Sequence, residues 1–346
     1  MKDIQIGSFT IGATHRPFII AEMSGNHNQS LDKALAIVDA AAAAGAHAIK
    51  LQTYTPDTMT LAGAYTIADE GSLWQGRELY ELYQEAYTPW EWHQAIFDRA
   101  REKGILAFSS PFDETAVDFL ENLNVPCYKI ASFENTDLPL LKKVAATGKP
   151  VIMSTGVATL ADIDEAVRTL REAGCDDIIL LKCTSTYPSS PENTNLRTIP
   201  HLSQLFHCPV GLSDHTMGIG ASVAAVALGA SVVEKHFTLS RAEGGVDAAF
   251  SLEPAELQAL VTESERAFLA LGYIQYGVQQ AEQKSRLFKR SVYVSRDLAA
   301  GEAFTKDNIR VVRPGIGLAP KYYDQVLGKT AKTAIKAGTP LTWDLL

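Results

Sequence analysis

The sequence predicts a closed barrel of alternating strands and helices, followed by a smaller second domain. Eight short runs rich in apolar and β-branched residues recur between residues 18 and 238, and segments with helical periodicity separate them. The pattern changes after about Gly272. Strands that alternate with helices pair in parallel, and eight such units close into a (β/α)8 barrel without leaving an edge strand.

The eight predicted strands share apolar centres and polar carboxyl ends. They are Phe18–Ser24, Ala48–Tyr54, Ile105–Ser110, Cys127–Ser132, Val151–Thr155, Ile178–Thr184, Pro209–Asp214 and Val232–Thr238. Apolar residues three and four positions apart predict helices between them, at Ser30–Ala44, Pro89–Lys103, Thr115–Asn122, Leu160–Ala173, Ile219–Leu228 and Pro254–Leu271. The first strand is not followed by GxGxxG, which disfavours a doubly wound dinucleotide-binding sheet. The insertion Pro56–Ala86 is rich in Tyr, Trp and Gly, and insertions of this length often form lids.

Three segments follow from these patterns. We expect the barrel domain at residues 1–272, a polar and Gln-rich linker at residues 273–284, and a C-terminal domain at residues 285–346. The last segment contains short strand-like pieces separated by Gly and Pro turns. A domain of about 60 residues is near the lower limit for independent stability, so we expect it to pack on another surface.

Charge divides the chain in the same place. The net charge of the whole chain is −9, but residues 284–346 carry +7 and residues 1–283 carry −16. The basic residues are scattered among apolar ones without an aromatic platform, so we expect an anionic small-molecule site and no nucleic-acid partner. We also expect no membrane span and no signal peptide. Four cysteines without a CxxC pair are typical of reduced thiols in a cytoplasmic enzyme.

Two histidines end the last two predicted strands, His215 and His236. Neighbouring strands lie about 4.8 Å apart, so both imidazoles can reach one divalent metal ion. Water, a substrate oxygen or a carboxylate such as Glu234 would complete the ligand set. The alternative is that each histidine is an ordinary hydrogen-bonded residue of the barrel mouth.

Lysines and hydroxyl groups accompany the histidines at the other strand ends. The lysines are Lys50, Lys129 and Lys182, and the hydroxyl-bearing residues are Ser110, Ser132, Ser154, Thr184 and Ser213. Ammonium groups surrounded by hydrogen-bond donors form an anion site, most often for phosphate. Two alternatives stay open: the lysines pair with Glu22 or Glu234, or one of them is the nucleophile of a Schiff-base aldolase.

Two carboxylates are candidates for proton transfer, Glu22 and Glu134. Each follows or ends a predicted strand, so each can face the reacting groups. The alternative is a structural role as ion-pair partners of Lys50 and Lys129.

Several motifs together resemble one known family. AEMSGNHNQS, IKLQTY, FSSPFD, YKIASFENTDLPLL, IMSTGVAT, LKCTSTYPS, GLSDHTMGIG and EKHFTL resemble the sialic acid synthase family of phosphoenolpyruvate-dependent nonulosonate synthases. The tail, with KRSVYVSRDLAAGEAFT and VVRPGIGLAP, resembles the antifreeze-like (SAF) domain of that family. The resemblance covers essentially the whole chain, in order.

The resemblance implies carbon–carbon bond formation between phosphoenolpyruvate and the aldehyde of an N-acylated amino sugar. It implies Mn2+, Co2+ or Mg2+ on His215 and His236. It also implies a domain-swapped homodimer, in which the C-terminal domain covers the partner's barrel and Arg313 reaches the acceptor sugar. The expected catalytic residues are Glu22, Lys50, Lys129, Glu134 and His236, and the expected substrate-binding residues are Ser110, Ser132, Ser154, Thr184, Ser213, Asp247 and Arg313.

One motif departs from the family pattern. The loop after the eighth strand usually reads Pro-Asp-His in the sialic acid synthases, and here it reads Val246–Asp247–Ala248. The acid is kept and its neighbours differ, which puts N-acetylmannosamine in doubt and favours a deoxy-diacetamido sugar. The same chemistry in N-acetylneuraminic or legionaminic acid synthesis, a Schiff-base aldolase, and a non-catalytic carbohydrate- or ice-binding protein remain as alternatives.

Overall fold

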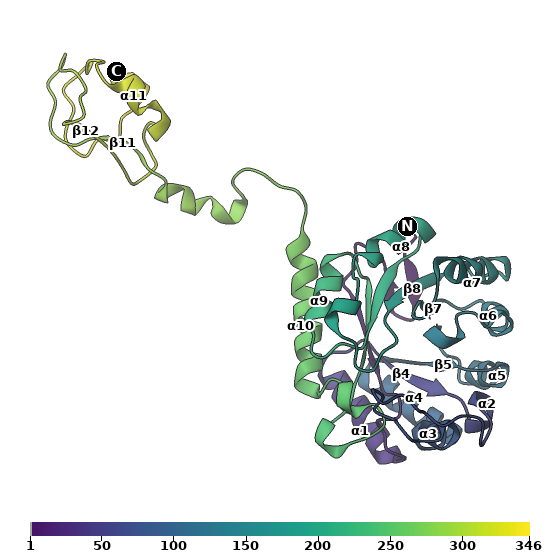
Figure 1. Ribbon diagram of the computed structural model, residues 1–346. Coiled ribbons are helices and arrows are strands. Elements are labelled where there is room, and N and C mark those ends of the chain that lie inside the picture. Colours follow the sequence, from purple (N-terminus) through teal and green to yellow (C-terminus); the bar gives the residue numbers. More distant parts are fainter. Residues whose placement is uncertain (1) are drawn as a thin grey trace. The chain divides into compact units, whose positions relative to one another are not determined.

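The first of two compact units is a closed barrel of eight parallel strands (Figure 1). The computed structural model describes residues 2–346, and the units are Met1–Gly272 and Tyr273–Leu346. The barrel strands follow one another around the barrel in chain order: β3 (Phe18–Glu22), β4 (Ala48–Thr53), β5 (Leu106–Pro111), β6 (Tyr128–Ile130), β7 (Val151–Ser154), β8 (Ile178–Cys183), β9 (Val210–Asp214) and β10 (Val232–His236). The predicted (β/α)8 barrel is confirmed.

Helices surround this barrel (Figure 1). They are α1 (Leu31–Ala43), α4 (His93–Lys103), α5 (Glu114–Asn122), α6 (Leu138–Ala145), α7 (Leu160–Glu172), α8 (Thr198–Phe206), α9 (Gly220–Ala227) and α10 (Pro254–Leu271). The insertion after β4 contributes α2 (Pro56–Met59) and α3 (Leu79–Ala86). Short 3-10 turns lie at Trp90–Trp92, Ser132–Glu134, Pro191–Asn193, Arg241–Glu243, Ala248–Phe250, Gln280–Glu282, Lys284–Phe288, Pro320–Tyr322 and Trp343–Leu345.

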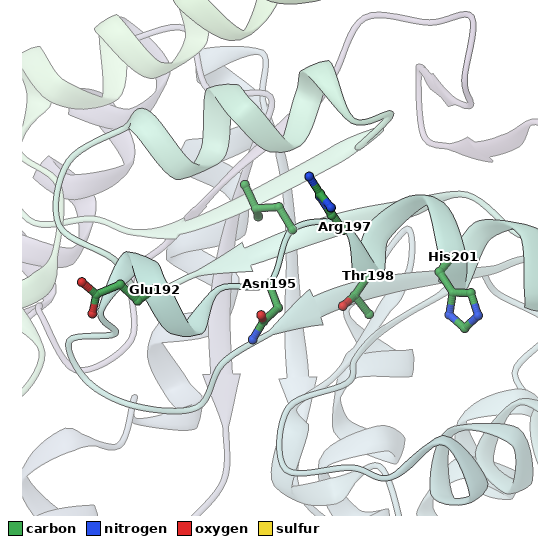
Figure 2. A pocket seen from close by; sticks show the side chains of 6 residues that line it. Glu192, Asn195, Arg197, Thr198 and His201 are labelled. Carbon is green, nitrogen blue, oxygen red and sulfur yellow. The ribbon is translucent and has the colours of Figure 1, made fainter.

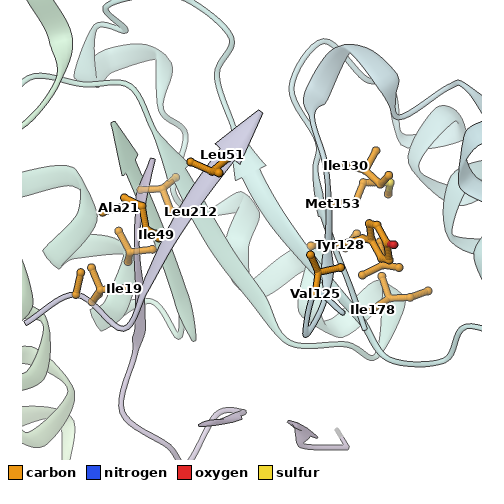
Figure 3. Close-up of a cluster of buried hydrophobic side chains, with 14 of the residues drawn as sticks. Ile19, Ala21, Ile49, Leu51, Val125, Tyr128, Ile130, Met153, Ile178 and Leu212 are labelled. Atoms are coloured by element: carbon orange, nitrogen blue, oxygen red, sulfur yellow. The ribbon is translucent and has the colours of Figure 1, made fainter. Parts of the chain in front are cut away.

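Side chains along each barrel strand point alternately toward the surrounding helices and into the barrel. Ile19 and Ala21 of β3 belong to the large cluster between strands and helices, part of which Figure 3 draws. Phe18 and Ile20 belong instead to the cluster inside the barrel. Side chains alternate along a strand, so Glu22, two residues after Ile20, continues the inward-facing row to the carboxyl end of the barrel.

An N-terminal hairpin packs against the barrel interior. Its strands β1 (Ile4–Ile6) and β2 (Phe9–Ile11) are antiparallel, and Ile4, Ile6 and Ile11 share a buried cluster with the inward-facing barrel residues. The sequence patterns did not predict this hairpin, because three-residue strands are too short to give a reliable period. Apolar side chains therefore fill the barrel near the amino ends of its strands. The polar side chains at the carboxyl ends are available to form a functional site.

Six of the eight barrel strands end one or two residues earlier than the sequence predicted, whereas β5 ends one residue later and β9 ends at the predicted residue. The run Phe18–Ser24 leaves the strand after Glu22, and Ser24 has a φ of 46°. A left-handed backbone cannot continue a strand, so Ser24 turns the chain across the barrel mouth. Polar residues after the strands thus lie in short mouth loops.

The second unit contains one small sheet with its own core. Strands β11 (Ser291–Val294) and β12 (Ile309–Val312) are antiparallel, and α11 (Tyr323–Val326) follows them. Their core includes Val292, Val294, Phe304, Ile309 and Leu341. Residues 273–284 are exposed throughout. No helix within residues 2–346 is long and apolar enough to span a membrane.

Candidate active site

Four buried charges meet inside the carboxyl end of the barrel. Lys50 of β4 lies 2.6 Å from Glu22 of β3, its register partner. Glu234 of β10 lies 3.8 Å from Lys50 and 3.8 Å from Lys129 of β6. All four side chains are buried. A buried charge needs a partner, so the two lysines and two glutamates hold each other in place.

Burial and neighbouring charges shift the pKa values of these four side chains. Burial raises the pKa of Glu22 above its ordinary value, and Lys50 opposes that shift. Burial acts in the same direction on Glu234, but the ammonium groups of Lys129 and Lys50 outweigh it and hold the pKa of Glu234 below its ordinary value. Burial lowers the pKa of Lys129 despite Glu234. Glu234, which the sequence offered as either metal ligand or ion-pair partner, forms ion pairs with both lysines.

A cluster of donors at the ends of β6 and β7 adjoins this network, and we call Lys129, Ser132, Ser154 and Gly156 the anion cradle. Lys182 of β8 does not belong to it: Leu180, two residues earlier, packs between strands and helices, so Lys182 lies on the outward face of the strand and donates to Thr184 instead. Lys129 donates to the hydroxyl of Ser154 over 2.7 Å. The backbone N–H of Gly156 donates to the hydroxyl of Ser132 over 3.1 Å. Ammonium, hydroxyl and backbone donors close together are the groups that hold phosphate and carboxylate.

Gly156 allows these loops to approach one another. A Cβ atom at this position would lie 2.2 Å from the hydroxyl oxygen of Ser185 and 2.7 Å from that of Ser132. Real Cβ atoms do not approach so closely, so a side chain here would push the mouth loops apart. Glycine is required for close approach, since its φ is not in the left-handed region.

The other predicted hydroxyl groups bond within the same strand ends. Lys50 donates to Ser110 over 3.4 Å, and Ser213 donates to Glu234 over 3.2 Å. Thr184 accepts from Lys182 and donates to the carbonyl oxygen of Asn193 over 3.0 Å. The structure therefore brings these residues to the same end of the barrel.

Glu134 differs from Glu22 in its partners. It lies in the 3-10 turn after β6, half-buried, and within residues 2–346 its Oε2 atom has no hydrogen-bond partner. Burial raises the pKa of Glu134 to about 7, although Lys129 acts against this shift. A carboxyl group with this pKa can accept and release a proton near neutral pH.

The two predicted metal ligands face each other. The ring centroids of His215 and His236 lie 5.3 Å apart. Nδ1 of His215 lies 2.9 Å from the carbonyl oxygen of Thr184, which leaves its Nε2 for another partner. Among the residues the structure describes, no hydrogen-bond partner meets the buried Nδ1 of His236.

This donor set fits a divalent cation that takes further ligands from elsewhere. Burial, with His215 nearby, holds the pKa of His236 well below its ordinary value, so its ring is neutral, the form that binds metal. In the described part of the chain, no three His, Cys, Asp or Glu side chains form a ready metal site. A catalytic ion usually has three protein ligands and at least one open position, so two imidazoles here leave the remaining positions to water, substrate or a further oxygen ligand.

A hydrogen-bonded chain that the sequence did not predict links the two halves of the mouth. Gln52 donates to Glu22 over 2.9 Å and to Ser24 over 3.1 Å. Ser24 in turn donates to Asp247, whose Oδ2 atom lies 4.0 Å from Nδ1 of His236. Asp247 is thus held beside the histidine pair. The sequence signal for Gln52 and Ser24 was only their position at strand ends.

Tyr187 is a further residue of the barrel mouth, and the sequence patterns did not predict it. Its ring centroid lies 4.4 Å from that of His215 and 5.4 Å from that of Phe250. The Tyr187–Pro188 pair marks a turn in the sequence, but a turn signal does not say which residue the ring will meet.

A cavity of about 400 Å³ opens beside these residues. Strand ends and mouth loops contribute polar groups to its lining, and the insertion Pro56–Ala86 contributes mainly apolar ones. The lining comprises Ser24, Gln52, Tyr54, Met59, Ile67, Asp69, Ser72, Trp74, Leu79, Leu82, Tyr83, Ala86, Phe112, Ala131, Phe133, Glu134, Tyr187, His236, Val246 and Asp247.

Another hollow lies along the start of α8 (Figure 2). Glu192 and His201 lie at its opposite ends, and Arg197 points away from both. These groups do not converge on a common point, so the hollow lacks the arrangement of a binding site.

Arg313 belongs to the second unit. It is exposed and directly follows β12. Its contact with an acceptor sugar stays a prediction.

A closed barrel whose carboxyl end gathers ion-paired lysines, hydroxyl groups and a histidine pair defines the class of (β/α)8-barrel enzymes. The model of the NeuB family matches residues 37–276, and that of the SAF domain matches residues 289–346. The chain belongs to the NeuB family.

Named relatives cover nearly the whole chain. It is 45% identical to the pseudaminic acid synthase of Campylobacter jejuni (serotype O:2) over 98% of both chains. It is 44% identical to the pseudaminic acid synthase of Helicobacter pylori, over 95% of this chain and 97% of that one. The crystal structure of the N-acetylneuraminic acid synthetase of Leptospira borgpetersenii matches 82% of this chain and 95% of its own, with a TM-score of 0.74 and 35% identity.

Proposed function

We propose that this chain is a pseudaminic acid synthase. It would condense phosphoenolpyruvate with 2,4-diacetamido-2,4,6-trideoxy-β-L-altrose and water to give pseudaminic acid and phosphate. The observation that carries this proposal is the 45% identity to a pseudaminic acid synthase over 98% of both chains. The barrel mouth supplies suitable chemistry, namely a cluster of cationic and hydroxyl groups beside a cavity.

Phosphoenolpyruvate binds in the anion cradle in this proposal. Its phosphate and carboxylate replace the internal hydrogen bonds of Lys129 and Ser154, with Lys50, Ser132 and Ser213 close by. Its methylene carbon attacks the aldehyde carbon of the sugar, which forms the new carbon–carbon bond. Holding both reactants in line provides much of the rate, and the fixed ammonium groups stabilise charge without reorganisation.

Water then adds to carbon 2 of the phosphoenolpyruvate skeleton, which is electron-poor after the attack. Glu134 takes the proton from this water. In the resulting hemiketal phosphate the hydroxyl group becomes the new carbonyl and loses its proton, while the bond between carbon 2 and the bridging phosphate oxygen breaks and inorganic phosphate leaves. The alkoxide formed from the aldehyde oxygen takes up one of the released protons. We assign the base to Glu134 rather than Glu22, because the Glu22 carboxylate lies 2.6 Å from Lys50 in an ion pair whereas Oε2 of Glu134 lacks a hydrogen-bond partner within residues 2–346.

We also propose that His215 and His236 hold a divalent cation, Mn2+, Co2+ or Mg2+. When bound, such an ion acts as a Lewis acid on the aldehyde oxygen of the sugar. The support for this proposal is the facing ring pair and the unpartnered Nδ1 atom of His236 among the described residues.

The same proposal includes a domain-swapped homodimer in which the C-terminal unit of each subunit serves the other's site through Arg313. Its support is the opposite net charge of the two parts of the chain, −16 for residues 1–283 and +7 for residues 284–346, and the exposure of two large apolar side chains in the otherwise polar linker, Ile274 at 89% and Tyr276 at 93%. Large exposed apolar side chains in succession indicate a surface that a partner covers. Light scattering of the purified protein tests it, and a monomer would contradict it.

An assay of phosphate release tests the function. Purified protein is incubated with phosphoenolpyruvate and one of three sugars: the trideoxy altrose derivative, the corresponding legionaminic acid precursor, or N-acetylmannosamine. We expect release with the first sugar and much less with the others. Turnover of N-acetylmannosamine alone would assign N-acetylneuraminic acid synthesis instead. Borohydride trapping of a pyruvate adduct on Lys129 or Lys182 would support the Schiff-base aldolase alternative.

A further inference from the structure

The cavity at the barrel mouth has two chemically different parts. Strand ends and mouth loops provide what we call the polar floor, which comprises Ser24, Gln52, Glu134, His236 and Asp247. The insertion after β4 provides what we call the apolar wall, which comprises Met59, Ile67, Trp74, Leu79, Leu82 and Tyr83; the insertion adds two polar lining residues outside this wall, Asp69 and Ser72. Glu134 and His236 of the proposed mechanism belong to the floor, whereas no residue of the wall takes part in that mechanism.

The apolar wall is an ordered element. The backbone N–H of Ile67 donates to the carbonyl oxygen of Arg77 over 3.0 Å, and that of Leu79 donates to Tyr65 over 3.0 Å. Thr66 and Glu78 form an antiparallel bridge between these pairs. The insertion is therefore folded back on itself, which fixes where its apolar side chains stand.

The wall is also tied to the polar floor. The indole N–H of Trp74 donates to the carbonyl oxygen of Val246 over 3.1 Å, next to Asp247. Where α3 ends, Ala86 lies so close to Gly25 that a Cβ atom on Gly25 would come within 3.2 Å of it. Contacts at both places hold the wall at a defined distance from the reacting groups.

An acceptor bound with its aldehyde at the floor places its other end among these apolar side chains. A hydroxyl group there would lose its hydrogen bonds to water and gain few from Met59, Ile67 or Leu79, whereas a methyl group would gain contact. The loss of one such hydroxyl–water contact, or the addition of one methyl contact, changes kcat/KM by roughly 10- to 200-fold.

We propose that the apolar wall determines acceptor specificity, by receiving the deoxygenated end and acyl methyl groups of a 6-deoxy, N-acylated amino sugar. This inference rests on the proposed function. Trp74 acts as a positioning residue, because its indole N–H joins the wall to the loop that carries Asp247. The side chains of the apolar wall discriminate between acceptor sugars, and phosphoenolpyruvate binds without contacting them.

Two acceptors that differ in one group test the inference, the 2,4-diacetamido-2,4,6-trideoxy sugar and its counterpart with a 6-hydroxyl group. We expect the wild-type protein to favour the deoxy sugar on the order of 100-fold in kcat/KM. Leu79→Asn and Ile67→Thr are expected to reduce this preference at least 10-fold, mainly by lowering kcat/KM for the deoxy sugar, with the KM for phosphoenolpyruvate unchanged.

Leu73→Asn is the matched control, because Leu73 belongs to the same insertion but is exposed and does not line the cavity. It should leave both acceptors unaffected. Equal losses for both acceptors in the wall variants, or no loss, would overturn the inference while leaving the proposed function intact. A wild-type protein that released no phosphate with either acceptor would overturn the proposed function as well.

Discussion

Lys129 donates a hydrogen bond to the hydroxyl of Ser154 over 2.7 Å, from one barrel strand to the next. Both side chains are buried, and in the proposed function both contact phosphoenolpyruvate. In the free protein this hydrogen bond orients the ammonium group before the substrate arrives. Such preorganisation of a buried charge is what gives an anion site its affinity.

The first prediction concerns this pair. Ser154→Ala removes one hydrogen bond to a charged group, which is worth about 1.5–3 kcal/mol, so we expect the KM for phosphoenolpyruvate to rise roughly 10- to 100-fold. Lys129→Met should weaken binding further. Ser190→Ala, an exposed hydroxyl after β8, is the control. An unchanged KM in Ser154→Ala would remove Ser154 from the substrate site.

The second prediction concerns Glu134 and pH. Burial raises its pKa to about 7, and only the ionised form can accept a proton. We therefore expect kcat to rise as pH increases through about 7. Glu134→Gln should lower kcat by roughly 10²- to 10⁴-fold. The rise of kcat with pH near 7 should also be lost in this variant. If the variant keeps this rise, another group is the base.

The third prediction concerns the metal ion. His215→Ala and His236→Ala should each lose bound Mn2+ in titration calorimetry as well as activity, and EDTA should inactivate the wild-type protein reversibly. His201→Ala, an exposed histidine on α8 (Figure 2), should behave as wild type. Stoichiometric Mn2+ binding in both site variants would place the ion elsewhere.

The fourth prediction concerns Gly156. A methyl group there would meet the hydroxyl oxygens of Ser185 and Ser132, so Gly156→Ala should disturb the anion cradle and raise the KM for phosphoenolpyruvate at least 10-fold. Gly220→Ala is the matched control, because a Cβ atom at this position has no heavy atom within 4 Å among its described surroundings. Equal kinetics for the two variants would show that the loops tolerate the added group.

The fifth prediction concerns acid stability. Burial lowers the pKa of His27 and of His93 to about 4, whereas both would titrate near 6.5 in the unfolded chain. Between these values the unfolded state binds more protons, so stability falls as pH falls from 6.5 to 4. Each histidine accounts for about 3 kcal/mol of the free energy of unfolding over this range.

Denaturant unfolding at several pH values measures this effect. His93→Gln also removes contacts with Thr53 and Pro89, so it should be less stable at neutral pH, but its stability should depend less on pH than that of the wild type. His201→Gln should keep the wild-type dependence. A His93→Gln profile parallel to that of the wild type would contradict the shifted pKa.

Local patterns were sufficient for the barrel and for the residue types of its mouth. The period of apolar residues separates strands from helices, and polar residues at strand ends mark the carboxyl face, as with Lys50 and His236. The N-terminal hairpin was not predicted, because its strands Ile4–Ile6 and Phe9–Ile11 are too short to establish a period. The end of the first barrel strand was predicted two residues too late, because the turn at Ser24 depends on backbone conformation, which composition does not reveal.

The sequence by itself determined the fold class, the family motifs and the set of ionisable groups available to the site. Only the tertiary structure decided which of these groups form ion pairs and which stay available. Glu22 pairs with Lys50, while Glu134 keeps an oxygen without a hydrogen-bond partner in residues 2–346. Only the structure placed Tyr187 against His215 and lined the cavity with Ile67 and Leu79. The physical reason is that periodicity is a local property, whereas ion-pair partners and cavity linings depend on strand register and on packing between segments far apart in sequence.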